Sequence, residues 1–272
     1  MRAPITRRPA VAGYYYPADP ETLRQQVDGF IRADGVPAPA HAVIVPHGSY
    51  RYSGAIAGQT LARVAIPRRC VILGPSHTGS WMPWSLMGSG AYRTPLGEVP
   101  IDESCAEALL ARCPFLSPDA WAQRGEHAVE VVLPFLQRLG PRDLSVVPIV
   151  MGVLHFEECA QLACALAQVI RLQEEPVLLI ASSDLSHYET QPRGAAQDRV
   201  LLEAICRLDA STLRHHVEED SVLMCGAGAV ACVLEAAKEL GASRAALVRC
   251  GTSVDAGGDP NSVVGYAGVI IE

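Results

Sequence analysis

The chain has 272 residues, of which 49% are hydrophobic and 19% charged, and its formal net charge is −7. A chain of this length and composition is expected to fold and to bury a core without disulfides. Its acidic balance, with Lys238 as the one lysine, excludes a dense basic stripe of the kind that binds nucleic acid.

Nine cysteines are scattered without a CxxC motif or the paired spacing of a disulfide framework. An odd, dispersed set of thiols is typical of a reducing compartment, so we expect a cytoplasmic protein. The first twenty residues contain arginines but lack the apolar segment of a signal peptide. No stretch reaches the roughly 18 apolar residues that a membrane span requires, and we expect no membrane partner.

Buried apolar runs alternate with helix-like segments along the chain. Strands are predicted where β-branched residues cluster between turn residues, at 42–45, 70–73, 144–150, 177–181, 245–249 and 263–271. Helices are predicted from caps and apolar periodicity, at 20–33, 54–64, 102–112, 126–139, 157–170, 195–206, 209–217 and 229–240. A β excursion is expected over 81–101. This alternation predicts a single α/β domain over residues 1–272, with an αβα arrangement and a mostly parallel or mixed central sheet.

Two local features leave alternatives open. Pro134 lies inside the predicted helix 126–139, where it must either kink the helix or mark its true start near Leu133. The tyrosine triplet 14–16 either packs an N-terminal arm onto the domain or forms the wall of a pocket.

Histidines follow three similar strands, in the segments VIVPHGS, VILGPSHTG and LLIASSDLSH. Because parallel strands deliver their carboxyl ends to one edge of a sheet, we expect His47, His77 and the pair Asp184 and His187 to converge there. Imidazole is the commonest metal ligand in proteins. Two histidines with one anionic ligand form a facial metal site that keeps open coordination positions.

Cys225 is the candidate for the third ligand. It lies in LMCGAG, after an apolar run and just before a predicted helix. A helix N-terminus lowers the pKa of a nearby thiol, which would make the thiolate accessible. The alternative is a small buried hydrophobic residue, which is the usual role of a free cysteine.

His127 and Glu130 share a face of the predicted helix that begins at Glu126. They either cap this helix and carry solvated charge, or support a ligand imidazole or a substrate from behind.

Two other kinds of site match the sequence less well. The motif of Gly226, Gly228 and Ala231 fits GxGxxA, but it occurs late in the chain and after a very short apolar run, unlike a dinucleotide-binding fingerprint. A serine hydrolase is disfavoured because GPSHT lacks the last glycine of the nucleophile elbow. Ser183, Asp184 and His187 are also too close in sequence to face one another as a triad.

Seven segments occur in an order that resembles the Memo family, whose bacterial and archaeal members are called AmmeMemoRadiSam system protein B. The segments are VAGYYYPADP, VPHGSYRYSG, LGPSHTG, GEHAVEVVLPFL, VPIVMG, ASSDLSHY and CGAGAV. The resemblance runs from about residue 11 to the end of the chain. It implies a fold similar to that of class III extradiol dioxygenases.

The resemblance also implies a site and partners. The family's two histidines and one cysteine match His47, His77 and Cys225, and they imply one metal ion, iron or copper, with zinc also chemically reasonable. Asp184 and His187 match further residues of that pocket. The family's name implies a radical-SAM protein as a partner. The chain departs from the family's usual PHAGY by reading PHGSY, so Ser49 adds a hydroxyl beside the site.

From these residues we expect a metal-binding redox protein with a His/His/Cys site in a dioxygenase-like pocket. If it is an oxygenase, His187 would act as the acid/base and Asp184 would orient it. The alternative is a non-catalytic module that binds a peptide, a protein or a metal in the same pocket, because a fold alone does not decide function.

Overall fold

A mixed sheet forms the centre of the molecule. The computed structural model describes residues 5–32, 35–79 and 84–272. The strands follow one another across the sheet in the order β10 (Ala245–Thr252), β11 (Val263–Ile271), β2 (Ala42–Val45), β8 (Val177–Ser182), β3 (Arg69–Pro75), β7 (Ser145–Met151) and β4 (Ser85–Leu86). Strands β2, β8, β3 and β7 run parallel, whereas β11, β10 and β4 add to the sheet in antiparallel fashion.

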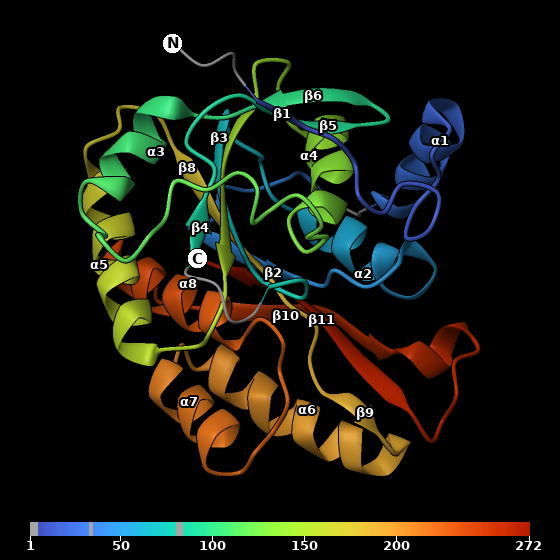
Figure 1. The fold of residues 1–272 in the computed structure, drawn as a ribbon. Helices are drawn as coiled ribbons and strands as arrows, with labels where there is room; N and C mark the ends of the chain where they lie inside the picture. The colour runs from blue at the N-terminus through green and yellow to red at the C-terminus, as the bar shows by residue number, and fades with distance from the viewer. Residues whose placement is uncertain (1–4, 33–34, 80–83) are drawn as a thin grey trace.

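Helices cover both faces of this sheet (Figure 1). One layer consists of α1 (Pro20–Phe30), α2 (Tyr50–Leu61) and α4 (Leu133–Leu139). The other contains α3 (Glu103–Leu110), α5 (Phe156–Arg171) and α8 (Ala227–Glu239). Two more helices, α6 (Gln191–Cys206) and α7 (Ala210–Glu218), continue this layer, with α6 packed on β10 and β11 and α7 on α8. The predicted αβα class with a mixed sheet is therefore confirmed.

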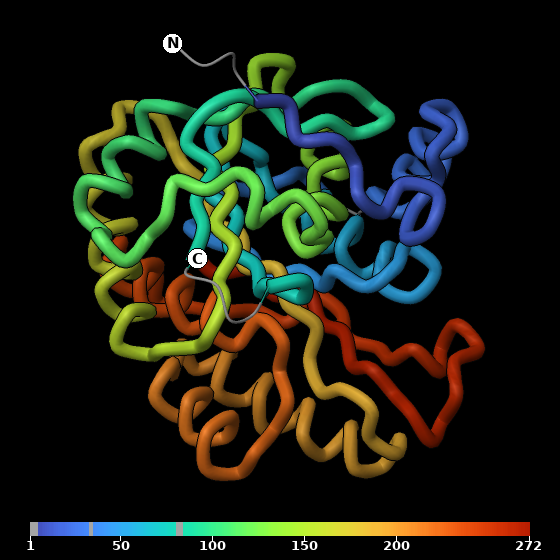
Figure 2. The backbone as a smooth tube through the Cα atoms, viewed as in Figure 1, coloured from blue at the N-terminus to red at the C-terminus, as the bar shows by residue number. Residues whose placement is uncertain are grey.

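Smaller elements lie at the edges of the sheet. A short sheet consists of β1 (Thr6–Arg7), β5 (Ala91–Thr94) and β6 (Gly97–Pro100), and β9 (His187–Glu189) pairs with β11. Two 3-10 helices are η1 (Glu130–Val132) and η2 (Ser253–Ala256). The N-terminal arm, residues 6–16, begins beside β5, where Thr6 and Arg7 pair with it, and then runs on toward α1, as Figure 2 shows. The predicted helix end at Ala33 and the start of the β excursion at Trp81 lie outside the described residues.

The elements begin and end where local chemistry favours it. Asp19 caps α1 by accepting from the Thr22 amide at 2.8 Å. Pro134 lies in the first turn of α4, so it marks the start of that helix rather than a kink. The helix predicted from residue 54 in fact begins at Tyr50. The helix begins immediately after the turn that carries His47, so its first residues lie close to this histidine.

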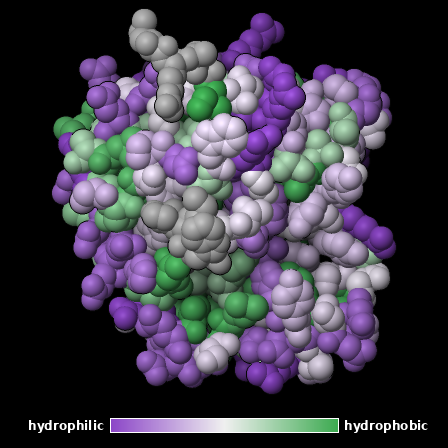
Figure 3. Space-filling model, viewed as in Figure 1, coloured by the Kyte–Doolittle hydropathy of each residue, from purple (hydrophilic) through white to green (hydrophobic). Residues whose placement is uncertain are grey.

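The core is continuous through the central strands. All residues of β2 and β8 are buried, as are all but the first of β3 and β7. The surface is mixed, with hydrophilic side chains over most of the face in Figure 3 and a group of hydrophobic ones in its lower part. Within the described ranges, no helix combines the length and apolarity needed to cross a bilayer.

Candidate metal centre

Three turns meet at one edge of the central sheet. Because β2, β8 and β3 are parallel neighbours, the segments that follow them leave the sheet on the same side. These segments carry His47, Asp184 with His187, and His77, and they line a pocket of about 600 Å³ together with Cys225. The expected convergence of these residues is observed.

The His47 ring is held in one neutral tautomer. Ser182 Oγ donates to the carbonyl of Ala128 at 2.6 Å, since a carbonyl can only accept. Ser182 Oγ must therefore accept from Nδ1–H of His47, at 2.9 Å. This leaves the Nε2 lone pair of His47 directed to the pocket, where Cys225 Sγ lies 3.2 Å away. Burial, aided by the nearby His77, lowers the pKa of His47 to about 3, so the ring is neutral at pH 7.

The carboxylate of Glu126 orients His77. Its Oε1 lies 2.9 Å from Nδ1 of His77, and its Oε2 accepts from the His77 backbone N–H. Burial alone would raise the pKa of Glu126, but hydrogen bonds from His77 and from the Ala128 amide outweigh it and bring the pKa to about 2. A carboxylate behind a histidine is the usual support of a metal-ligating imidazole, with Nε2 free.

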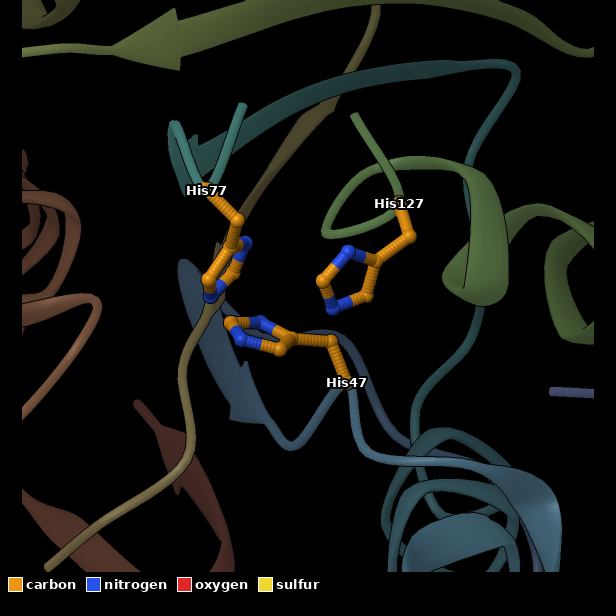
Figure 4. A group of neighbouring side chains, drawn as sticks. All are labelled: His47, His77 and His127. Carbon is orange, nitrogen blue, oxygen red and sulfur yellow. The ribbon is translucent and has the colours of Figure 1, made fainter. Parts of the chain in front are cut away.

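His127 brings a third imidazole to the same place (Figure 4). Its ring stacks on that of His77 with centroids 4.4 Å apart, and it lies edge-on to His47 at 5.4 Å. Burial, with the nearby His47, lowers the pKa of His127 to about 4. We expect His127 either to cap its helix or to support a ligand or substrate from behind; its ring instead lies beside those of His47 and His77, in one group of potential ligands.

Cys225 lies against His47. Its Sγ is 3.2 Å from Nε2 of His47 and accepts from the Asp184 amide at 3.4 Å. The expected lowering of its pKa is wrong: burial, with the nearby Asp184 carboxylate, raises the pKa of the thiol. The helix N-terminus of α8 does not compensate for this desolvation. The thiolate would therefore need a bound cation to form at neutral pH.

Potential ligand atoms form two groups that share His47. One group is His47, His77 and His127, and the other is His47, Asp184 and Cys225. Within each group the candidate atoms lie within 4.8 Å of one another. The predicted residues His47, His77 and Cys225 all line one pocket, but His77 and Cys225 belong to different groups, which share only His47.

Asp184 and His187 face the pocket but do not pair as expected. Asp184 Oδ1 accepts from the backbone N–H groups of His47 and Gly48, at 2.9 and 3.3 Å, and so fixes the turn. His187 is oriented instead by a hydrogen bond from its Nδ1–H to the carbonyl of Leu185, at 2.8 Å. This contact again leaves Nε2 free.

The remaining predicted residues have different surroundings. Ser49 lines the pocket and is the N-cap residue of α2. Glu130 lies elsewhere: its buried carboxylate accepts from Ala10 N, Val11 N and the hydroxyl of Tyr16. The expected support of a ligand imidazole comes from Glu126, which the sequence also marks by its place beside His127.

Aromatic side chains form much of the pocket wall. Tyr15 lies 4.7 Å from the His127 ring, between centroids, whereas Tyr16 is buried in the core. Both alternatives for the tyrosine triplet are therefore realised. Sequence reasoning missed other tyrosines because nothing in their local pattern distinguishes them: Tyr52, Tyr188 and Tyr266.

The disfavoured alternatives also have structural explanations. A Cβ at Gly226 would come within 2.6 Å of the Ser182 carbonyl oxygen, so this glycine allows α8 to approach β8. A Cβ at Gly228 would lie 2.7 Å from Leu154, which leaves no space for a phosphate. Ser182 contacts an imidazole, but its hydroxyl is buried and bonded to Ala128, unlike that of a nucleophile.

Comparisons with known proteins show the family to which the chain belongs. The family model described as Memo-like protein matches residues 7–270. A MEMO1 family protein of Methanopyrus kandleri is 38% identical over 280 residues, covering 98% of this chain and 99% of its own length. One from Aquifex aeolicus is 38% identical over 267 residues, covering 97% and 98%.

Among solved structures, an uncharacterized protein of Escherichia coli K12 has a similar fold, with a TM-score of 0.55 and 15% identity. The likeness covers 85% of this chain and 99% of that one. The family match and the curated relatives extend over nearly the whole chain, and they include every residue of the pocket. The chain belongs to the Memo family.

Proposed function

We propose that this protein binds one metal ion, iron or copper, through His47, His77 and Cys225, and that it uses the site for redox chemistry. The observation that carries the proposal is the arrangement of the two imidazoles. Each has its Nδ1–H engaged by Ser182 or Glu126, so each directs an unprotonated Nε2 to the pocket, and Cys225 Sγ lies 3.2 Å from that of His47. A histidine that serves only the core has no need of this arrangement.

The donor set fits the proposed metals. Neutral imidazoles with one thiolate suit copper, iron or zinc better than magnesium or calcium. Cys225 would lose its proton on coordination, because a bound cation inverts the local preference for the neutral thiol. When bound, iron or copper supplies one-electron chemistry, which no side chain of the pocket provides.

The rest of the pocket is suited to a bound organic ligand. His187 has a free Nε2 and would exchange a proton with the ligand. Tyr15 and Tyr266 would exclude water and pack against an apolar group. The same wall also supports the second candidate function, a module that binds a small molecule or peptide without turnover.

Metal analysis of single variants tests the ligand assignment. We expect His47→Ala, His77→Ala and Cys225→Ser each to lose most of the bound metal after anaerobic reconstitution with Fe(II) or Cu(I). His41→Ala is the matched control, because His41 precedes the strand that His47 follows, and it should keep full metal content.

His127→Ala distinguishes between the two groups of candidate ligands. Loss of metal in His127→Ala, with full retention in Cys225→Ser, would replace the His/His/Cys assignment by a three-histidine site. Oxygen uptake on catechols that disappears in His47→Ala would support an enzyme. Stoichiometric metal binding without uptake would favour the binding module.

A further inference from the structure

We propose that the N-terminal arm is a positioning element of the metal centre, fixed by the buried pair of Arg7 and Glu130. The proposal rests on the proposed function for its metal readout. The arm would hold the backbone of residues 123–130, the segment that carries Glu126 and His127.

Arg7 makes an unusual number of contacts for a residue near a chain end. Its side chain is 1% exposed, and its guanidinium lies 4.8 Å from the centre of the Tyr92 ring. It donates to the carboxylate of Glu130, to the carbonyl of Gln123 at 3.2 Å and to the carbonyl of Glu126. The planar fork of an arginine can hold several acceptors at fixed angles in this way, whereas a lysine cannot.

Glu130 holds the arm from the other side. Besides Arg7, its carboxylate accepts from Ala10 N at 2.7 Å, Val11 N at 3.0 Å and the Tyr16 hydroxyl at 2.5 Å. These bonds engage both oxygens of a side chain that is 0% exposed. The arm and residues 123–130 are therefore connected through a shared set of charged hydrogen bonds.

This connection leads directly to the ligand rings. Arg7 binds the carbonyl of Glu126, and the carboxylate of the same Glu126 holds both the amide and Nδ1 of His77. The arm also places Tyr15 against the ring of His127. The carbonyl of Tyr15 accepts from Tyr50 N at 2.8 Å, at the start of the helix that follows His47. The arm thus contacts Glu126, which supports His77, the ring of His127, and the start of the helix that follows His47.

A purely structural arm and a positioning arm predict different results. If the arm only adds stability, weakening it should lower the melting temperature and leave metal affinity unchanged in the folded protein. If it positions Glu126, metal affinity should fall as well. Loss of a group that orients a ligand typically weakens metal binding 10–100-fold.

Arg7→Lys is the decisive variant, because it keeps the positive charge beside Glu130 but loses the fork that holds the two carbonyls. We expect its zinc dissociation constant, from competition with a chromogenic chelator, to rise about 10–100-fold. Arg69→Lys is the matched control. Arg69 pairs with Asp102 at 3.3 Å, at the opposite end of the strand that leads to His77, and its substitution should leave zinc affinity unchanged.

Amide hydrogen exchange of the metal-free protein gives a second readout. We expect exchange at His77 and Ala128, whose amides donate to Glu126, to be at least about tenfold faster in Arg7→Lys. If the wild-type chain binds none of zinc, Fe(II) and Cu(I), the proposed function fails, and exchange alone then decides the role of the arm. If Arg7→Lys does not fold, Glu130→Gln replaces it. Unchanged affinity and exchange in a folded variant, or equal effects in Arg69→Lys, would overturn the proposal.

Discussion

Single hydrogen bonds decide what the residues of this pocket can do. Ser182 and Glu126 each engage one ring nitrogen, and in doing so they determine which nitrogen of His47 and His77 is free. Nothing in the local sequence marks Ser182 as the partner of the His47 ring. Ser182 also donates to the carbonyl of Ala128, which is 54 residues away in the sequence, so no local pattern could indicate this contact.

Ser182→Ala tests whether Ser182 fixes the Nδ1–H tautomer of His47. The change leaves Nδ1–H of His47 and the Ala128 carbonyl buried without partners, and we expect it to lower the free energy of unfolding by about 1–3 kcal/mol. The Nδ1–H tautomer of His47 should also lose its dominance in long-range ¹H–¹⁵N NMR spectra.

Ser183→Ala is the control for that experiment. Ser183 is equally buried but accepts from Gly226 N and donates to the Asp184 carbonyl, away from the ring. If the His47 ring gives the same spectrum in wild type and Ser182→Ala, Ser182 does not fix its tautomer.

At the scale of elements, close packing of α2 on β11 sets the position of the turn that carries His47. A Cβ built at Gly268 of β11 would lie 1.8 Å from Oγ1 of Thr60, which is fully buried in α2. Glycine at this position lets the helix lie directly on the strand. Because α2 begins at Tyr50, a displacement of the helix would also move His47.

Gly268→Ala should therefore destabilise the protein by about 1–3 kcal/mol in urea unfolding, because the added methyl group overpacks the interface. Thr60→Ala should restore part of the loss, since it removes the atom that the methyl group meets. Gly29→Ala in α1 is the control: no atom lies within 4 Å of its Cβ, and we expect a gain of about 0.5–1 kcal/mol. Equal stability of wild type and Gly268→Ala would refute the tight contact.

At the scale of the whole molecule, the pocket makes folding depend on pH. The pKa of His47 is lowered to about 3 and that of His127 to about 4, mainly by burial. The unfolded chain titrates these rings near pH 6.5, so between about pH 6.5 and 4 it binds more protons than the folded chain. Stability must then be greatest above pH 6.5 and fall as the pH drops through this window.

For the metal-free protein we expect each ring to contribute up to about 1.4 kcal/mol of lost stability per pH unit in that window. Urea unfolding at half-unit pH steps measures the slope. His127→Phe should reduce this slope by up to about 1.4 kcal/mol per pH unit, the value for one proton, because one of the two shifted groups is gone. If the slope is the same in His127→Phe and wild type, the protons that bind on unfolding bind to other residues.

Much of the architecture could be predicted before any coordinates. Buried strands such as 42–45 and 177–181 are apolar over their whole length, and this pattern belongs to parallel strands covered on both faces. Helix starts were harder to predict: α2 begins four residues before the predicted 54, because Tyr50 and Tyr52 give no helix signal of their own. The single-domain organisation stays a prediction.

The sequence by itself determined the αβα class, the membership in the Memo family and the edge of the sheet where His47, His77 and Cys225 meet. The fold class and the sheet edge depend on local periodicity and on where strands end, which neighbouring residues encode, whereas the family depends on ordered segments shared along the chain. Only the tertiary structure decided that Glu126 rather than Glu130 supports the His77 ring, that His127 lies beside the rings of His47 and His77, and that Cys225 has a raised pKa. These outcomes depend on burial and on contacts between residues far apart in the chain, and no local pattern specifies either.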